Sequence, residues 1–388
     1  MATEAVLDLA GLQALVDALR ERGYTVLGPV VRDGAVVPAP VSSVDELPRG
    51  WGDEQDGAFY RLRRRDDDAL FGFASGAQSW KPVLFPARQL LWQGRRTGDG
   101  FTVEEPTDAG SRFGSPPYAL LGVRSCDLHA IGIHDRVLLG RAGVDAHYAA
   151  ARQDVFVVAV ACSDPSGTCF CVSMRTGPRP ESGFDLCLTE ISTAADGHRL
   201  VAEAGSDRGA EILAALPAEH AAAAVEADRA AAAQVTEVAT GRMGRQLDTE
   251  GLRDVLYAGV ESPRWDDVAS RCLACTNCTL VCPTCFCTSV DDETDLTGDV
   301  ASRRRSWDSC FTGDFSHLHG GSVRASVRSR YRQWATHKLA SWYDQFGTSG
   351  CVGCGRCITW CPAAIDITEE AAAVRADPGP PSASAEGA

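Results

Sequence analysis

The chain has 388 residues, of which 45% are hydrophobic, so it is long enough to form two or three domains with a sizeable core. Asp and Glu outnumber Lys and Arg by 52 to 37, and the formal net charge of −15 argues against nucleic acid as a partner. No apolar run approaches the length of a bilayer span, and the first ten residues carry Glu4 and Asp8 without an early positive charge, so we expect neither membrane insertion nor a secretory signal.

Helical and strand patterns alternate over the first 205 residues. Apolar residues at helical spacing predict an amphipathic helix over 7–19. Strands are predicted at 24–31, 59–62, 84–85, 118–123, 154–161 and 184–191. A further helix is expected at 128–139, with Asp127 as its N-cap. This interleaving indicates a mixed α/β domain over residues 1–205.

The composition changes beyond this domain. Residues 206–262 are expected to form a helical connector, which Pro217 interrupts. Residues 263–370 contain two cysteine runs and, between them, a polar segment followed by a strongly helical segment at 323–346. Residues 371–388 are expected to be a disordered tail, because their last part is almost entirely Pro, Ser, Gly and Ala.

The two cysteine runs share one spacing, C-x2-C-x2-C-x3-C followed by Pro. The first run consists of Cys272, Cys275, Cys278 and Cys282, and the second of Cys351, Cys354, Cys357 and Cys361. This spacing is typical of bacterial ferredoxins, in which thiolates ligate [4Fe–4S] clusters and the fourth Cys of each run ligates the other cluster. The similarity implies one cluster on Cys272, Cys275, Cys278 and Cys361 and a second on Cys351, Cys354, Cys357 and Cys282.

Zinc binding and disulfide formation fit these cysteines less well. Zinc sites usually present two separated C-x2-C pairs, and disulfides require an oxidising compartment. Sixteen cysteines without an export signal instead predict metal binding in a reducing cytoplasm.

Eight cysteines lie outside the predicted ligand set, and their role is open: Cys126, Cys162, Cys169, Cys171, Cys187, Cys285, Cys287 and Cys310. One interpretation is that some of them hold a third cluster where the N-terminal domain meets the ferredoxin part. The other is that they are small buried apolar residues. The sequence Thr-Cys-Phe-Cys occurs at 168–171 and again at 284–287. The short C-x-C spacing counts against the third-cluster interpretation, because two cysteines so close in sequence reach two corners of one cube with difficulty.

The chain has neither a dinucleotide-binding G-x-G-x-x-G nor a phosphate-binding G-x-x-x-x-G-K-[ST] motif, so we expect nicotinamide and flavin to bind another polypeptide. No nucleophile with a paired base is evident, and no catalytic residue is predicted. Arg124 and Asp127 are expected to form an ion pair at a domain or subunit contact. We expect Lys81, His337 and Lys338 to be solvent-facing or interface charges.

Several motifs follow one another in a characteristic order: 124–130 (RSCDLHA), 282–287 (CPTCFC), 307–310 (WDSC) and 351–357 (CVGCGRC). Together they resemble the iron–sulfur (beta) subunit of cytosolic sulfhydrogenase-type nickel–iron hydrogenases. The same 4Fe-4S dicluster family includes one of the subunits of anaerobic sulfite reductase. The resemblance implies a non-catalytic subunit that relays single electrons through two [4Fe–4S] clusters. Its implied partners are the small and large subunits of a nickel–iron hydrogenase, together with a flavin/NAD(P)-binding subunit.

The expected fold class is therefore α+β, with a mixed α/β N-terminal domain and a C-terminal ferredoxin-like dicluster domain elaborated by helices. Two alternative functions remain at this point: an electron-transfer subunit of an anaerobic sulfite reductase, and a self-contained iron–sulfur reductase that binds its own flavin or substrate. The sequence leaves open the cluster potentials, the direction of electron flow and the choice between NADH and NADPH.

Overall fold

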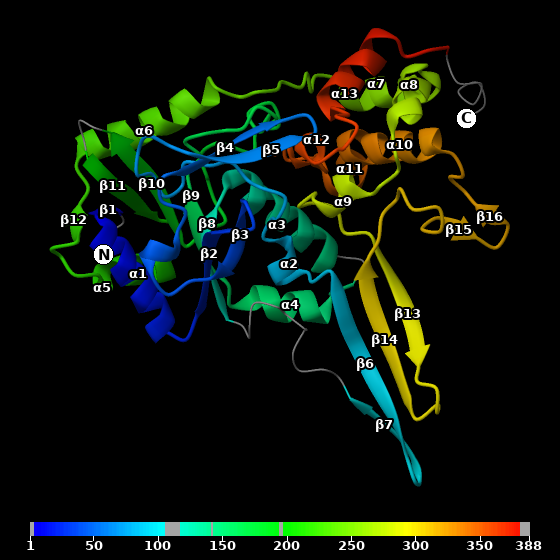
Figure 1. The fold of residues 1–388 in the computed structure, drawn as a ribbon, viewed down its shortest axis with the longest axis horizontal. Coiled ribbons are helices and arrows are strands. Elements are labelled where there is room, and N and C mark those ends of the chain that lie inside the picture. The colour runs from blue at the N-terminus through cyan, green and yellow to red at the C-terminus, as the bar shows by residue number, and fades with distance from the viewer. Residues whose placement is uncertain (1–3, 105–116, 141–142, 194–196, 381–388) are drawn as a thin grey trace.

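A computed structural model describes residues 4–104, 117–140, 143–193 and 197–380, and its mixed helices and sheets confirm the predicted fold class (Figure 1). The N-terminal part contains one eight-stranded sheet in the order β12-β1-β11-β10-β9-β8-β2-β3. Its strands are β1 (Glu4–Leu7), β2 (Thr25–Arg32), β3 (Ala35–Pro40), β8 (Tyr118–Val123), β9 (Phe156–Val160), β10 (Leu186–Thr193), β11 (Gly197–Ala204) and β12 (Ala221–Ala223). Its helices are α1 (Leu9–Glu21), α3 (Ser125–Leu138), α4 (Ala146–Gln153), α5 (Asp207–Ala215) and α6 (Glu226–Thr240).

The four central strands β2, β8, β9 and β10 are parallel, and helices cover both faces of the sheet. Val158 packs in one core with residues of α1 and α5, whereas its neighbour Val157 packs in another with residues of α3 and α4. Because both faces of a central strand are buried, its sequence is a continuous apolar run rather than an alternating one. This explains the apolar runs at 118–123 and 154–161, and the strands predicted there are confirmed as β8 and β9.

A second sheet extends away from this body as a long arm (Figure 1). It joins two distant parts of the chain in the order β13-β14-β6-β7. Its strands are β6 (Arg88–Thr97), β7 (Gly100–Glu104), β13 (Thr288–Thr294) and β14 (Val300–Trp307). The remaining strands form two hairpins, β4 (Trp51–Asp56) with β5 (Phe59–Arg64), and β15 (His317–Leu318) with β16 (Gly321–Ser322).

Short helices surround the cysteine runs. They are α7 (Leu252–Ala258), α8 (Arg264–Arg271), α9 (Asn277–Leu280), α10 (Val327–Thr336), α11 (Trp342–Phe346), α12 (Arg356–Thr359) and α13 (Ile367–Ala376), with a π-helical turn at His337–Ser341. Trp265, Tyr331 and Trp334 lie at the centre of the core that these helices share, and cysteines of both runs pack against it. Among the described residues, no helix combines the length and apolar character needed to cross a membrane.

Four sequence predictions about local structure were wrong. Residues 84–85 are not a strand, because Leu84 is the last residue of the short helix α2 (Lys81–Leu84), which has Pro82 in its first turn. Asp127 is not the N-cap of α3, whose N-cap is Arg124. The connector is not purely helical, since β12 within it pairs with β1. Residues 371–376 belong to α13 rather than to a disordered tail, and 381–388 lie outside the described residues.

Candidate iron–sulfur centres

The two cysteine runs adopt the same backbone conformation. In the first run, Ala274 and Thr276 have positive φ angles of 50° and 68°. In the second, Gly353 and Gly355 occupy the equivalent positions with φ of 65° and 73°. Each run thus has two left-handed residues between its first three cysteines and then continues into a single helical turn, α9 or α12. This left-handed geometry curls each loop, and the three cysteines of the first run line one cavity.

The curled loops also direct backbone N–H groups toward sulfur. The amide of Ala274 lies 3.4 Å from Cys272 Sγ, and that of Gly353 lies 3.5 Å from Cys351 Sγ. Near the end of the second run, the amide of Ile365 lies 3.4 Å from Cys361 Sγ. Such N–H···S contacts stabilise negative charge on the sulfurs and are one of the means by which a protein sets a cluster potential.

The structure brings the four cysteines predicted for the first cluster to one cavity. Cys272, Cys275, Cys278 and Cys361 all line a space of about 420 Å³. Phe311, Tyr331 and Trp334 form part of its wall. Cys275 is exposed and the neighbouring Leu273 is 69% exposed, so this cavity lies close to the protein surface.

The four cysteines predicted for the second cluster are also neighbours. Burial raises the pKa of the Cys351 thiol to about 12, against the lowering effect of the Lys338 charge, and Cys282 contributes to the increase. Burial likewise raises the pKa of the Cys354 and Cys357 thiols, again with Cys282 as a contributor. Cys282, from the first run, therefore lies beside the three sulfurs of the second run.

The donor set of each group fits the predicted cofactor, because four thiolates are the usual ligands of a [4Fe–4S] cube. No three His, Cys, Asp or Glu side chains of the described residues are arranged to hold a single metal ion. The cysteines of the first set instead surround an open space.

Two lysines that were expected to be solvent-facing or interface charges are buried beside the cysteines. Lys338 is 5% exposed, and its ammonium nitrogen lies 3.2 Å from Cys282 Sγ and 3.0 Å from the Thr284 hydroxyl. Lys81 is equally buried, donates to the carbonyl of Cys285 at 3.3 Å and lies 3.7 Å from the centre of the Trp307 ring. Burial lowers the pKa of Lys81 to about 8, against the opposing effect of Cys285 and Cys282. Sequence reasoning missed these two residues because their burial depends on long-range packing.

Three of the remaining cysteines lie near the same lysines. The thiol of Cys285 is hydrogen-bonded to that of Cys282, and the thiol of Cys287 to that of Cys310. The hydrogen bond with Cys310 is the main reason that the pKa of Cys287 is lowered to about 7. This side of the second centre is therefore rich in sulfur and in positive charge.

The N-terminal part contacts the second cysteine run directly. Arg356, within that run, forms an ion pair of 3.0 Å with Asp127, and the two side chains are 1% and 4% exposed. The expected pairing of Asp127 with Arg124 is therefore wrong, since Arg124 donates instead to the carbonyls of Ala161, Phe71 and Phe73. The backbone amide of Phe170 donates to the carbonyl of Gly353 at 2.8 Å.

Comparison with known proteins agrees with the site geometry. The family model for the 4Fe-4S dicluster domain matches residues 271–365, which contain both cysteine runs and confirm the predicted dicluster domain. The chain is 34% identical over 261 residues to the sulfhydrogenase 2 subunit beta of Pyrococcus furiosus, a match that covers 65% of this chain and 72% of that protein. No solved structure matches the chain.

Proposed function

The chain belongs to the family of sulfhydrogenase beta subunits, and we propose that it relays single electrons through two [4Fe–4S] clusters within an oxidoreductase complex. In this proposal its partners are a flavin subunit that oxidises or reduces NAD(P)H and a nickel–iron hydrogenase core. The chain itself is an electron-transfer subunit without a catalytic residue. We further propose the cytoplasm as its location, because a reducing compartment keeps these cysteines available for iron.

The observation that carries the proposal is the position of Cys357 between the two sets. Cys357 belongs to the second set by sequence, yet it lines the cavity of the first set. Cys278, of the first set, in turn contributes to the raised pKa of Cys357. In this proposal the two centres therefore lie side by side, and such proximity favours electron transfer between them.

When bound, each [4Fe–4S] cluster would accept one electron and give it up again. The residues of this chain determine how readily that happens. The amides of Ala274 and Gly353 contact ligand sulfurs, and the Lys338 ammonium lies beside Cys282. The buried side chains of Phe311, Tyr331 and Trp334 cover one side of the first centre. Because a nicotinamide supplies electrons in pairs and a metal centre takes them singly, two adjacent one-electron carriers suit a position between them.

We propose the domain organisation that the sequence indicated: a mixed α/β domain at 1–205, a connector at 206–262 and the cluster-binding domain at 263–370. One adjustment follows from the fold, since the pairing of β12 with β1 extends the first unit to Ala223. The buried Asp127–Arg356 pair joins the two larger units.

The test uses the complex that copurifies with the full chain and compares Cys278→Ser with Cys187→Ser. Cys187 is buried in β10 and packs in the core on the α3 side of the sheet, away from both predicted ligand sets. Cys278→Ser should abolish NAD(P)H-linked turnover while leaving reduction of an artificial dye by the catalytic core intact, and Cys187→Ser should preserve both. Survival of NAD(P)H-linked turnover in Cys278→Ser would refute the relay.

The same purification identifies the partners. Recovery of nickel–iron and flavin subunits supports the proposed complex. Recovery of a sirohaem protein in their place would indicate that the chain relays electrons for sulfite reduction instead.

A further inference from the structure

A second cysteine-lined cavity lies where the N-terminal part meets the second cysteine run. Cys126, Cys162, Cys169 and Cys171 line a space of about 380 Å³, and Cys354 of the predicted second centre lies in its wall. None of these four cysteines belongs to a ferredoxin-type run.

The parallel sheet explains how residues so far apart in sequence meet here. Cys126 lies in the first turn of α3, directly after β8, and Cys162 follows the end of β9. Because β8 and β9 are parallel neighbours, both cysteines lie at the same edge of the sheet, where α/β folds commonly bind ligands.

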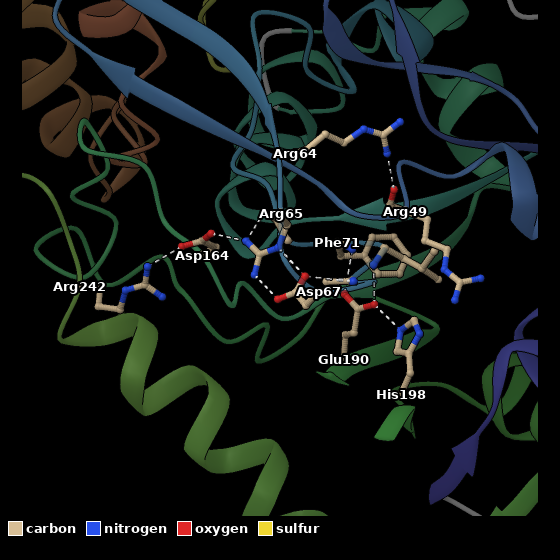
Figure 2. Close-up of polar contacts among 12 residues, drawn as sticks. Arg49, Arg64, Arg65, Asp67, Phe71, Asp164, Glu190, His198 and Arg242 are labelled. Carbon is tan, nitrogen blue, oxygen red and sulfur yellow. Dashed lines mark hydrogen bonds and ion pairs between the residues drawn. The ribbon is translucent and has the colours of Figure 1, made fainter. Parts of the chain in front are cut away.

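The other two cysteines are carried by the loop that follows Cys162. This loop is fixed at Asp164, which accepts hydrogen bonds from Arg65 at 2.6 Å and from Arg242 at 2.7 Å (Figure 2). It is fixed again at Thr168, whose hydroxyl lies 2.8 Å from that of Thr359. Phe170 is fully buried in the core of the cluster-binding part, while Cys169 and Cys171 on either side of it both line the cavity.

The charge of the cavity wall favours an anionic occupant. Arg124 lines the cavity and is 4% exposed. Its guanidinium donates to three neutral acceptors, the carbonyls of Ala161, Phe71 and Phe73 at 3.0, 2.6 and 2.8 Å. Phe71 is in turn held by Glu190, which accepts a hydrogen bond from its amide (Figure 2). The carboxyl of Asp53 lies within electrostatic range of Arg124, but no ion pair of Arg124 is found among the described residues. An anion in the cavity would therefore offset more of this buried charge.

We infer that this cavity holds a third [4Fe–4S] cluster, ligated by Cys126, Cys162, Cys169 and Cys171. Four thiolates complete the ligand set of a cube, and the guanidinium of Arg124 offsets part of its negative charge. Contact between the cavity and Cys354 places the third centre beside the second. Its role as a relay rests on the proposed function: one electron received from the second centre reduces it, and release of that electron reoxidises it. The metal site itself stands independently of that role.

The experiment measures iron and acid-labile sulfide in the full-length chain, purified without oxygen, as wild type and as four cysteine-to-serine variants, at Cys126, Cys171, Cys187 and Cys278. Wild type should contain about twelve iron atoms, four for each cube. Cys126→Ser and Cys171→Ser should each lose about four of them while keeping the electron paramagnetic resonance (EPR) signals of the other two centres. Cys187→Ser, the matched control, should keep all twelve.

Several results would overturn the inference. These are about eight iron atoms in wild type, an iron content unchanged in both Cys126→Ser and Cys171→Ser, or zinc bound by these cysteines. A variant that does not fold would lose nearly all its iron. In that case the number of iron atoms in the wild-type chain, about twelve or about eight, decides whether the third cluster is present. Cys278→Ser separates the two proposals, because it empties part of the dicluster domain and leaves the third centre intact. If Cys278→Ser retained its iron and Cys171→Ser lost it, the proposed two-cluster relay would fail and the new site would stand.

Discussion

The ammonium nitrogen of Lys338 lies 3.2 Å from the sulfur of Cys282, in the buried wall of the predicted second centre. Burial opposes the charged form of Lys338, but Cys282 and Cys285 outweigh it and raise its pKa well above the usual value. The lysine therefore remains charged beside a predicted ligand. Positive charge next to a cluster sulfur favours the reduced, more negative state of the cluster.

Replacing Lys338 with Met should therefore lower the reduction potential of the second centre. Loss of a hydrogen bond to a charged group costs roughly 1.5–3 kcal/mol, which corresponds to a shift on the order of 60–130 mV for a one-electron couple. A redox titration followed by EPR measures the shift. Lys338→Arg, which keeps the charge, should restore most of the potential; an unchanged potential in Lys338→Met would show that the lysine does not act on the cluster.

Gly355→Ala should disrupt the contact between the N-terminal part and the second cysteine run. A Cβ at this position would lie 2.4 Å from the carbonyl oxygen of Thr168, and the backbone φ is +73°. Gly347 is the matched control, because its φ is +69° and a Cβ there meets nothing within 4 Å. Gly347→Ala should cost only the backbone strain of about 1–2 kcal/mol.

Thermal unfolding and iron content distinguish these two alanine variants. We expect Gly355→Ala to unfold at a lower temperature than Gly347→Ala and to contain less iron. Equal unfolding temperatures would mean that the loop at Thr168 moves without cost and does not fix the second run.

Arg356→Met should destabilise the folded chain because it leaves the carboxylate of Asp127 buried without its partner. Breaking a buried ion pair in this way typically costs about 3–5 kcal/mol. The double variant Arg356→Met with Asp127→Leu removes both charges and should recover much of that loss. Denaturant unfolding of the two variants under anaerobic conditions provides the comparison, and a double variant no more stable than the single one would argue that the pair is not coupled.

Removal of iron should affect the two halves of the chain differently. The eight-stranded sheet has its own apolar cores, built from residues such as Leu15, Val157 and Val158. The cysteines of both runs instead pack against the core around Trp265 and Trp334. Because metal binding contributes directly to the folding free energy of such sites, chelation should expose the cluster-binding part to proteolysis first. Simultaneous cleavage of both halves would contradict this.

The predicted ligands could be read from the sequence because three sulfurs of each run lie in one short loop, so that their spacing alone describes much of the geometry. The loop conformation at Ala274 and Thr276 could not be predicted from the sequence, since neither residue favours a positive φ. The burial of Lys81 and Lys338 depends on elements far away in the chain. Their charge alone led to the expectation of solvent-facing or interface side chains.

The fold was predictable where burial on both faces produced long apolar runs, as in β8 and β9. The fold was less predictable where pairing between distant strands overrode the local conformational preference of the residues. The alanines of β12 favour helix, yet they pair with β1 at the edge of the sheet. Strands β6 and β14 pair across about two hundred residues, and no local pattern indicates that contact.

The most direct test of the central claim is EPR of the fully reduced chain, purified without oxygen, together with its iron and sulfide content. Two adjacent cubes should give a spectrum broadened by magnetic interaction, and Cys278→Ser should remove the part of that broadening that comes from the first centre while a signal from the second centre persists. A colourless chain, or one in which zinc takes the place of iron and sulfide, would contradict the account.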